Sequence, residues 1–364
     1  MGDNIYLVLE NGKKFSGKSF GAKGEVTGEV VFNTGMASYL ETITDPNYYG
    51  QIVAQTFPII GNYGVIPEDT DNRKPRLSAY IVKHWCEQPS NFRSAGCLDS
   101  YLKSNGIVGL YGIDTRTLTK IIREEGVMNG RIMSGTDNVE LEEIKNYKIE
   151  PPAEIVGTKK IYNAVPNQNA KFKICIYDYG LKQGLIDALS VRDCDIIVIP
   201  PAVNFNILLE FKPNGIVLSN GPGNPAENPA AIRNIRGLLE HKIPMLGVGM
   251  GHQLLALAKG LCVQKMNHGH RGDNQPVRIT ETGQLCTTSQ NHSYCVDLKS
   301  LKSPEKNNEQ TPKQTLVNVN DQTCEGIEYT DVPAMSVQFN PEARKETVFL
   351  LDKFISMMQM MQVR

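Results

Sequence analysis

The sequence predicts an α/β protein with a β-rich N-terminal domain, followed by a domain in which helices flank a mostly parallel sheet. Strand-like alternation with turn residues dominates the first half, and short apolar runs alternate with helix-length patterns in the second. A polar, proline-containing stretch separates the halves, and 364 residues fit two domains of roughly 100 to 200 residues each. The expected ranges are 1–150 for the first domain, 151–170 for a linker and 171–364 for the second domain.

The first half opens with a predicted hairpin. Residues 5–10 read as a strand, and the Asn11-Gly12 dipeptide that follows is typical of tight hairpin turns. A further strand is expected at 29–33 and a turn at 44–48. A helix is expected from Thr115 to Gly126, because glycine commonly ends helices.

The second half carries the pattern of a parallel sheet covered on both faces. Its buried-strand candidates are 173–178, 195–200, 215–219 and 244–248, and helices are expected near 181–191 and 226–241. In open parallel sheets the chemistry lies beyond the carboxyl ends of the strands. The residues directly after each apolar run are therefore the first candidates for a functional site.

Composition excludes several classes of function. A formal net charge of -1 argues against a nucleic-acid or anionic membrane partner, and no apolar run approaches the roughly 18 residues that span a bilayer. The first residues lead directly into strand-like sequence without a secretion signal, so a cytoplasmic location is expected. The 8 cysteines are scattered and lack zinc-site spacing, which predicts reduced thiols and no metal. No cofactor is expected for this chain.

Two loops that follow predicted strands are candidates for chemistry. Residues 219–225, Ser-Asn-Gly-Pro-Gly-Asn-Pro, form a tight turn whose backbone N–H groups could face a ligand oxygen, or which could simply connect a strand to a helix. Residues 246–258 read as a strand, a sharp turn of small residues and an apolar helix, the pattern of a nucleophile elbow. The central residue of that elbow is Gly249, which has no side chain to attack a substrate.

Together these two loops resemble the class I glutamine amidotransferase family, and further motifs resemble the small subunit of carbamoyl-phosphate synthetase. In the second half these motifs are residues 265–277, 288–294 and 336–342. In the first half residues 28–34, 44–46, 51–53, 61–62 and 112–116 resemble the N-terminal domain peculiar to that subunit. The resemblance covers essentially the whole chain.

The resemblance implies a catalytic triad of which one member remains. In this family a cysteine thiolate attacks the glutamine amide, a histidine held by a glutamate serves as base and acid, and the released ammonia passes to a large synthetase subunit. The nucleophile position is Gly249, the base position is Asn340 and the acid is Glu342. An amide does not titrate near neutrality, so the glutaminase is expected to be inactive.

The glutamine-binding positions of the family transfer unevenly to this chain. Those with plausible identities are Gly221, Gly223, Met250, Gln253, Asn291 and Tyr294. Asn47 stands where the family usually has a serine, and Ser293 replaces a glycine. A side chain where the backbone must approach a ligand narrows the pocket, which puts glutamine binding in doubt.

The family also implies a partner, a heterodimer or larger assembly with the large synthetase subunit, to which ATP, magnesium and bicarbonate belong. It leaves open whether arginine or pyrimidine synthesis is served. Two alternatives remain: an active hydrolase with an unrecognised nucleophile, and a module that binds glutamine without hydrolysing it. The stand-ins considered for the nucleophile or base are His252, Cys262, Cys286, His292 and Cys295, none of which is at the elbow.

Three further segments receive structural interpretations. Residues 268–271, His-Gly-His-Arg, could suggest a metal site, but no carboxylate partner is evident in the sequence, so a structural loop is expected. Residues 354–361 have helical spacing and are expected to pack on the sheet, with partner docking as the alternative. Residues 343–351 replace the polar stretch that follows the family's triad, which favours natural degeneration over an engineered knockout.

Overall fold

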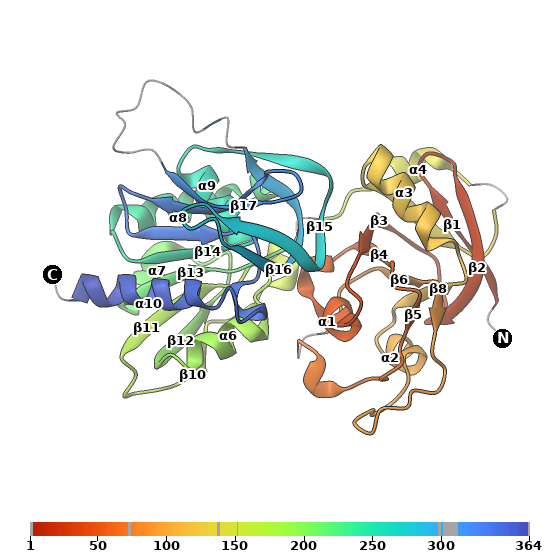
Figure 1. Cartoon of the computed structure of the whole chain (residues 1–364), viewed down its shortest axis with the longest axis horizontal. Helices are drawn as coiled ribbons and strands as arrows, with labels where there is room; N and C mark the ends of the chain where they lie inside the picture. The colour runs from red at the N-terminus through yellow and green to blue at the C-terminus, as the bar shows by residue number, and fades with distance from the viewer. Residues whose placement is uncertain are drawn as a thin grey trace. The chain divides into compact units, whose positions relative to one another are not determined.

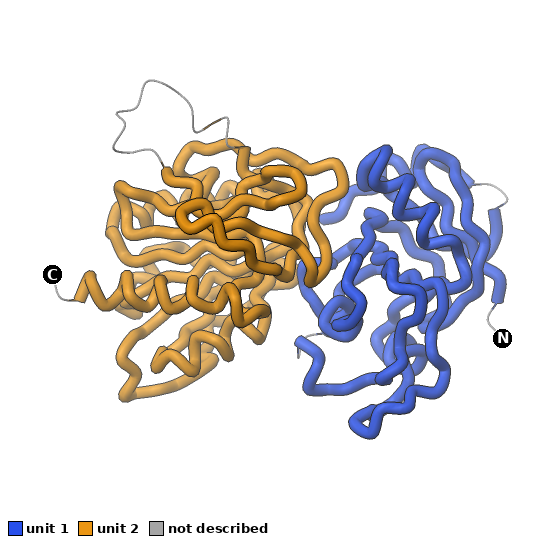
Figure 2. Tube along the Cα trace, in the orientation of Figure 1, with its two compact units in different colours: residues 1–150 blue, residues 151–364 orange. Residues whose placement is uncertain are grey.

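The computed structural model describes residues 3–71, 74–136, 139–150, 152–297, 300 and 312–362 (Figure 1). Met1 and Gly2 of the expected N-terminus and Pro151 of the expected linker lie outside the described residues. The chain divides into two compact units, residues 1–150 and residues 151–364 (Figure 2). Among the described helices none combines the length and the hydrophobicity needed to cross a membrane.

The first unit is a closed β-barrel with the strand order β1-β2-β8-β6-β4-β3-β9. The predicted hairpin around Asn11-Gly12 is confirmed, with Val8 paired to Lys14 across an antiparallel ladder. Alternate residues of the strands point inward, and the barrel interior contains fully buried Leu7, Ile52 and Leu110. The barrel strands are β1 (Asn4–Leu9), β2 (Lys14–Gly21), β3 (Val26–Asn33), β4 (Gln51–Gln55), β6 (Ala79–Val82), β8 (Val108–Tyr111) and β9 (Met128–Met133).

Helices and a small sheet surround this barrel. The predicted helix at 115–126 is confirmed as α3: Asp114 accepts a hydrogen bond from the Thr117 N–H at 3.0 Å, and Gly126 ends the helix with φ 95°. The predicted turn at 44–48 contains a short 3-10 helix. The remaining elements are α1 (Tyr39–Thr44), η1 (Pro46–Tyr48), β5 (Ile59–Ile60), η2 (Pro67–Asp69), β7 (His84–Trp85), α2 (Leu98–Ser104), α3 (Thr115–Glu125) and α4 (Leu141–Lys145).

The second unit is built on one mixed sheet with the order β10-β12-β11-β13-β14-β19-β18-β17-β15-β16. Its central strands from β12 to β19 pair in parallel, as predicted, but the strands on both sides of them are antiparallel. The expected mostly parallel sheet is therefore corrected to a mixed one. The connection between β18 and β19 is too short for the crossover that a parallel pair needs, so the chain can only turn back. The strands are β10 (Tyr162–Val165), β11 (Phe172–Tyr177), β12 (Cys194–Ile199), β13 (Gly215–Leu218), β14 (Met245–Val248), β15 (Cys262–Ile279), β16 (Leu285–Asp297), β17 (Lys313–Asn318), β18 (Cys324–Tyr329) and β19 (Ala334–Val337).

The segment 151–170 differs from the expected linker. It lies within the second unit, and its strand β10 pairs antiparallel with β12 at the edge of the sheet. The pairing gives the backbone of this polar segment hydrogen-bond partners, although few of its side chains are apolar. Periodicity of apolar residues could not reveal such an edge strand, because an edge strand buries little of its surface.

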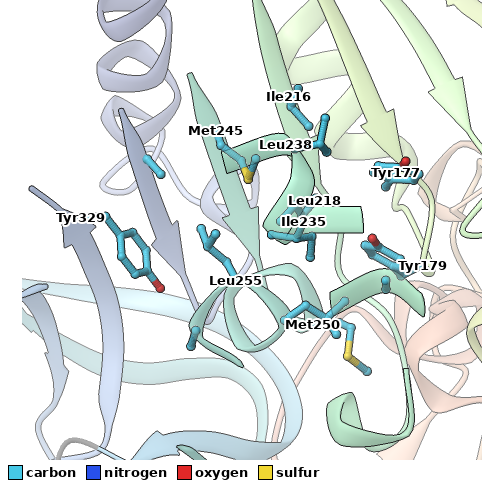
Figure 3. Packing of buried hydrophobic residues seen from close by; sticks show 14 of the residues in the cluster. Tyr177, Tyr179, Ile216, Leu218, Ile235, Leu238, Met245, Met250, Leu255 and Tyr329 are labelled. Atoms are coloured by element: carbon cyan, nitrogen blue, oxygen red, sulfur yellow. The ribbon is translucent and has the colours of Figure 1, made fainter. Parts of the chain in front are cut away.

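Helices cover both faces of this sheet, as the alternation of strands and helices predicts. Consecutive residues of β11 point to opposite faces: Cys175 belongs to one apolar cluster and Ile176 to the other. Figure 3 shows part of the first cluster, in which Leu238 of α8 and Leu255 of α9 accompany residues of the sheet. The helices are α5 (Ala153–Val156), α6 (Gln183–Ser190), α7 (Phe205–Glu210), η3 (Pro225–Glu227), α8 (Pro229–Glu240), α9 (Met250–Ala258), η6 (Pro341–Ala343) and α10 (Phe349–Gln362).

The C-terminal helix α10 packs on the second apolar cluster, as predicted for residues 354–361. Its buried residues include Leu351, Phe354 and Met358, which pack with sheet residues such as Ile176 and with α6. A Cβ placed on Gly215 of β13 would lie 2.8 Å from Phe354 Cζ. The helix therefore lies directly against the central strands.

Candidate active site

The strand β14, the turn at Gly249 and the helix α9 form the sharp elbow that the sequence predicts. Gly249 has φ 55° and ψ −108°, a backbone conformation that residues other than glycine rarely adopt. Its backbone N–H donates to Val337 O of β19 at 2.9 Å. Gly249 thus lies at the carboxyl end of β14, next to the end of β19, in a conformation that glycine adopts without strain.

A second glycine allows the helix to approach the sheet this closely. A Cβ placed on Gly251 would lie 2.1 Å from the carbonyl oxygen of Leu218 in β13. The Gly251 N–H donates to Ser219 O at 3.0 Å, which anchors the first turn of α9 to the loop after β13. The two loops singled out by the sequence are therefore in direct contact.

Asn220 connects the nucleophile position to the base position. A Cβ placed on Gly249 would lie 3.0 Å from Asn220 Cβ, and Asn220 Nδ2 donates to Asn340 Oδ1 at 2.9 Å. Asn220 and Asn340 are both buried. Asn220 was not predicted as a site residue, although it belongs to the loop 219–225, because only the backbone N–H groups of that loop were expected to face a ligand.

We expect Gly249→Ala to lower the free energy of unfolding by about 1 to 3 kcal/mol, because the new Cβ meets Asn220 in a disfavoured backbone conformation. Thermal unfolding followed by calorimetry measures the effect. The control is Gly184→Ala at an exposed position of α6 with ordinary space around it, where we expect no loss of stability and a gain of at most about 1 kcal/mol, because alanine forms helices better than glycine. Equal stability of the two variants would contradict the strain that we expect for a side chain at position 249.

The expected base and acid positions lie next to each other at the short helix η6. Asn340 precedes this helix, and its backbone N–H donates to Ser289 O at 3.1 Å. Glu342 lies within η6, where its Cγ would be 3.4 Å from a Cβ placed on Gly184. Thr347 Oγ1 donates to Pro341 O at 2.9 Å and stabilises the turn. The triad positions are thus carried by the loops after β14 and β19.

The two loop glycines of the expected substrate site are required by the packing of the chain on itself. A Cβ on Gly221 would lie 2.5 Å from Tyr179 O, in the loop after β11. Gly223 has φ 92°, and a Cβ there would lie 2.6 Å from Pro152 Cγ. Their identity is therefore explained by structure alone, whether or not a ligand binds.

The side chain of Gln253 joins α9 to two strands of the sheet. Its Nε2 donates to Tyr294 O of β16 at 2.8 Å and to Gln338 Oε1 at 3.0 Å. Gln338 directly follows β19. It was not predicted as a site residue, because within the motif 336–342 only Asn340 and Glu342 were assigned functions. Met250, the first residue of α9, is buried in the apolar cluster of Figure 3.

The remaining expected ligand positions divide between the two units. Asn291 and Ser293 lie on β16, where Asn291 pairs with Arg271 of β15 and Ser293 Oγ accepts from Arg271 Nη2. Asn47 lies in the first unit, and its N–H and its Nδ2 both donate to Asp45 Oδ1, at 2.8 and 2.6 Å. The elbow, Asn340 and Gln253 are thus brought together within the second unit, whereas Asn47 belongs to the first unit.

The structure does not favour any of the stand-ins for the missing nucleophile and base. Burial raises the pKa of the Cys295 thiol to about 11 and raises that of Cys286, which disfavours the reactive thiolate. Burial lowers the pKa of His252 to about 3 and that of His292 well below its usual range. Cys262 is exposed at the start of β15, beyond the end of α9 at Ala258, and so does not belong to the helix of the elbow.

Comparisons with known proteins cover both units. A family model for the carbamoyl-phosphate synthase small chain, CPSase domain, matches residues 7–132, and one for class-I glutamine amidotransferase matches residues 175–356. A carbamoyl phosphate synthase pyrimidine-specific small chain from Bacillus subtilis is 43% identical over 97% of this chain and 95% of its own length. A carbamoyl phosphate synthase small chain from Bacillus caldolyticus is also 43% identical, over 97% of this chain and 96% of its own length. A solved glutamine amidotransferase from Thermotoga maritima aligns with a TM-score of 0.39 and 16% identity over 54% of this chain and 87% of its own.

Proposed function

Because this chain belongs to the carbamoyl-phosphate synthase small chain family, we propose that it is a small subunit whose own glutaminase is inactive and which acts as a structural or regulatory partner of the large subunit. The observation that carries this proposal is Gly249 at the centre of the elbow, where the family's chemistry needs a thiolate. Without an attacking atom no covalent intermediate can form at this position.

The base position supports the same proposal. Asn340 offers an amide that neither takes a proton from a nucleophile nor returns one to leaving ammonia. Its Oδ1 accepts a hydrogen bond from Asn220, so the two amides bind each other. Glu342 keeps its identity, but a carboxylate that orients a histidine has no function when the histidine is absent.

We further propose that the partner is a large synthetase subunit that uses free ammonia, as the family name implies an assembly of a small and a large chain. The carbamoyl phosphate would serve arginine or pyrimidine synthesis, and the pyrimidine-specific name of the Bacillus subtilis relative favours the second. The proposed contribution of this chain is to bind the large subunit and to stabilise its conformation.

Reconstitution with the large subunit from the same organism tests this function. Carbamoyl phosphate synthesis is expected with ammonium as the nitrogen donor and not with glutamine. The purified chain alone is expected to release no ammonia from glutamine above a protein-free blank. Ammonia release, or a covalent adduct with 6-diazo-5-oxo-norleucine found by mass spectrometry, would instead support a hydrolase with a different nucleophile.

A second candidate function, a module that binds glutamine without hydrolysing it, is favoured by two buried polar atoms. Among the described residues neither Asn220 Oδ1 nor Gln338 Nε2 has a hydrogen-bond partner, and both residues border Gly249. An acceptor and a donor left unpaired could be satisfied by the amide group of a ligand. Calorimetry with millimolar glutamine tests this candidate, and the absence of measurable heat would rule it out.

A further inference from the structure

Three buried side chains from different strands converge within the second unit, outside the triad positions. His270 belongs to β15, His292 to β16 and Glu325 to β18, and one ligand atom from each lies within 4.8 Å of the others. All three are buried, and Glu325 is 0% exposed. The sequence analysis found no carboxylate partner near His270, and the structure corrects this: Asp321 and Glu325 both contact it. Asp321 is 51 residues further along the chain, so local spacing could not reveal it.

Each imidazole is oriented by an acceptor on its outer side. His270 Nε2–H donates to Asp321 Oδ2 at 2.9 Å, which leaves Nδ1 directed toward Glu325 Oε1 and Asn318 Nδ2, each at 3.4 Å. His292 Nδ1 lies 2.8 Å from the carbonyl oxygen of Tyr294, which can only accept, so Nδ1 carries the proton and Nε2 is directed into the cluster. Histidines that bind metals usually donate their other ring N–H to a carboxylate or a backbone carbonyl in this way.

The carboxylate is oriented as well. Glu325 Oε1 accepts from Asn318 Nδ2 at 3.1 Å, and Glu325 Oε2 accepts from Gln290 Nε2 at 3.0 Å. Carboxylates that bind metals are commonly held by such hydrogen bonds. Shared partners therefore hold the three inward-facing groups in place: Asn318 Nδ2 contacts Glu325 and His270, and Gln290 contacts Glu325 and His292.

The centre of the cluster brings acceptor atoms close together. Gln290 Nε2 donates to Thr288 Oγ1 and to Glu325, so Gln290 Oε1 faces His292 Nε2 at 2.9 Å. When the ring of His292 is neutral its proton is on Nδ1, so Nε2 and Gln290 Oε1 are two acceptors facing each other. The distance from His270 Nδ1 to Glu325 Oε1 is 3.4 Å, longer than the roughly 2.7 to 2.9 Å of a charge-assisted hydrogen bond. Two ligand atoms at about 2.0 to 2.1 Å from a tetrahedral metal are separated by about 3.3 to 3.4 Å, which matches the distance from His270 Nδ1 to Glu325 Oε1.

We propose that His270 Nδ1, His292 Nε2 and Glu325 bind a zinc ion. Imidazole nitrogens together with one carboxylate suit Zn²⁺ better than Ca²⁺ or Mg²⁺, which prefer oxygen ligands alone. The ion would join β15, β16 and β18 in the antiparallel part of the sheet. It would also support the candidate active site, because Tyr294 O accepts from both His292 Nδ1 and Gln253 Nε2.

The test is the metal content of the full chain, produced without a polyhistidine tag. After incubation with Zn²⁺ and gel filtration, mass spectrometry of the elements should find about one zinc per chain, since structural zinc sites bind tightly. Incubation with Co²⁺ in place of zinc should give the visible absorption bands of a tetrahedral cobalt site. A wild-type chain that retains less than about a tenth of an equivalent of zinc and gives no such bands overturns the proposal, whatever the variants do.

Variants identify the ligands. Glu325→Gln and His292→Asn should each lower the retained zinc at least about tenfold, because each removes a ligand atom. The matched control is His252→Asn, which changes another buried histidine that is hydrogen-bonded to Ser336 and lies outside the cluster. Its zinc content should equal that of the unchanged chain. Equal zinc retention by Glu325→Gln, His292→Asn and His252→Asn would overturn the assignment of the ligands.

Discussion

The double variant Gly249→Cys, Asn340→His should release ammonia from glutamine on the order of 10³-fold faster than the unchanged chain, or more. The reason is chemical: the variant restores a nucleophile and a base next to Glu342, the one triad position that keeps its identity. Each single variant should remain near the background rate, because triad members act as a unit. A coupled glutamate assay on the four proteins measures the comparison.

The geometry limits how complete this restoration can be. The Cβ of a cysteine at position 249 would lie 3.0 Å from Asn220 Cβ, so Asn220 must shift by a few tenths of an ångström. That shift would disturb its hydrogen bond to residue 340, which the histidine must in any case replace. Glutamine hydrolysis by the unchanged chain at a rate equal to that of the double variant would refute the assignment of Gly249 as the lost nucleophile position.

Gly251→Ala should prevent the second unit from folding stably, with an expected loss of at least about 3 kcal/mol. A Cβ at this position would lie 2.1 Å from Leu218 O and 2.6 Å from Leu218 C, which are backbone atoms of the buried central strand β13. The strand is fixed by parallel pairing on both sides, so it cannot move away without breaking its hydrogen bonds. Calorimetry and the yield of soluble chain measure the loss.

The matched control for this second prediction is Gly96→Ala, which introduces the same methyl group where nothing lies within 4 Å and the backbone is not left-handed. Its melting temperature should stay within the experimental error of the unchanged chain. If Gly251→Ala were as stable as this control, the close contact between α9 and β13 would be wrong, and with it the geometry of the elbow.

Local patterns in the sequence were sufficient for many of the elements. The hairpin around Asn11-Gly12 and the helix that ends at Gly126 depend on the conformations that these residues prefer, which neighbouring residues alone express. The elbow at Gly249 follows from an apolar run, small residues and a helical pattern in direct succession. That Gly249 and Asn340 carry neither a thiol nor an imidazole was also evident from the sequence, because the chemistry of a residue type does not depend on the fold.

Tertiary structure decided the features in which distant segments meet. The sequence did not show that β10 forms an edge strand, that β15 to β18 are antiparallel, or that Asn220 binds Asn340 across 120 positions. It also did not show that His270, His292 and Glu325 converge. Apolar periodicity records which side of an element is buried, but the identity of its neighbours depends on the order of the strands. By itself the sequence therefore determined many of the elements, the family resemblance and the residue types at positions 249 and 340, whereas only the fold determined which polar side chains face one another.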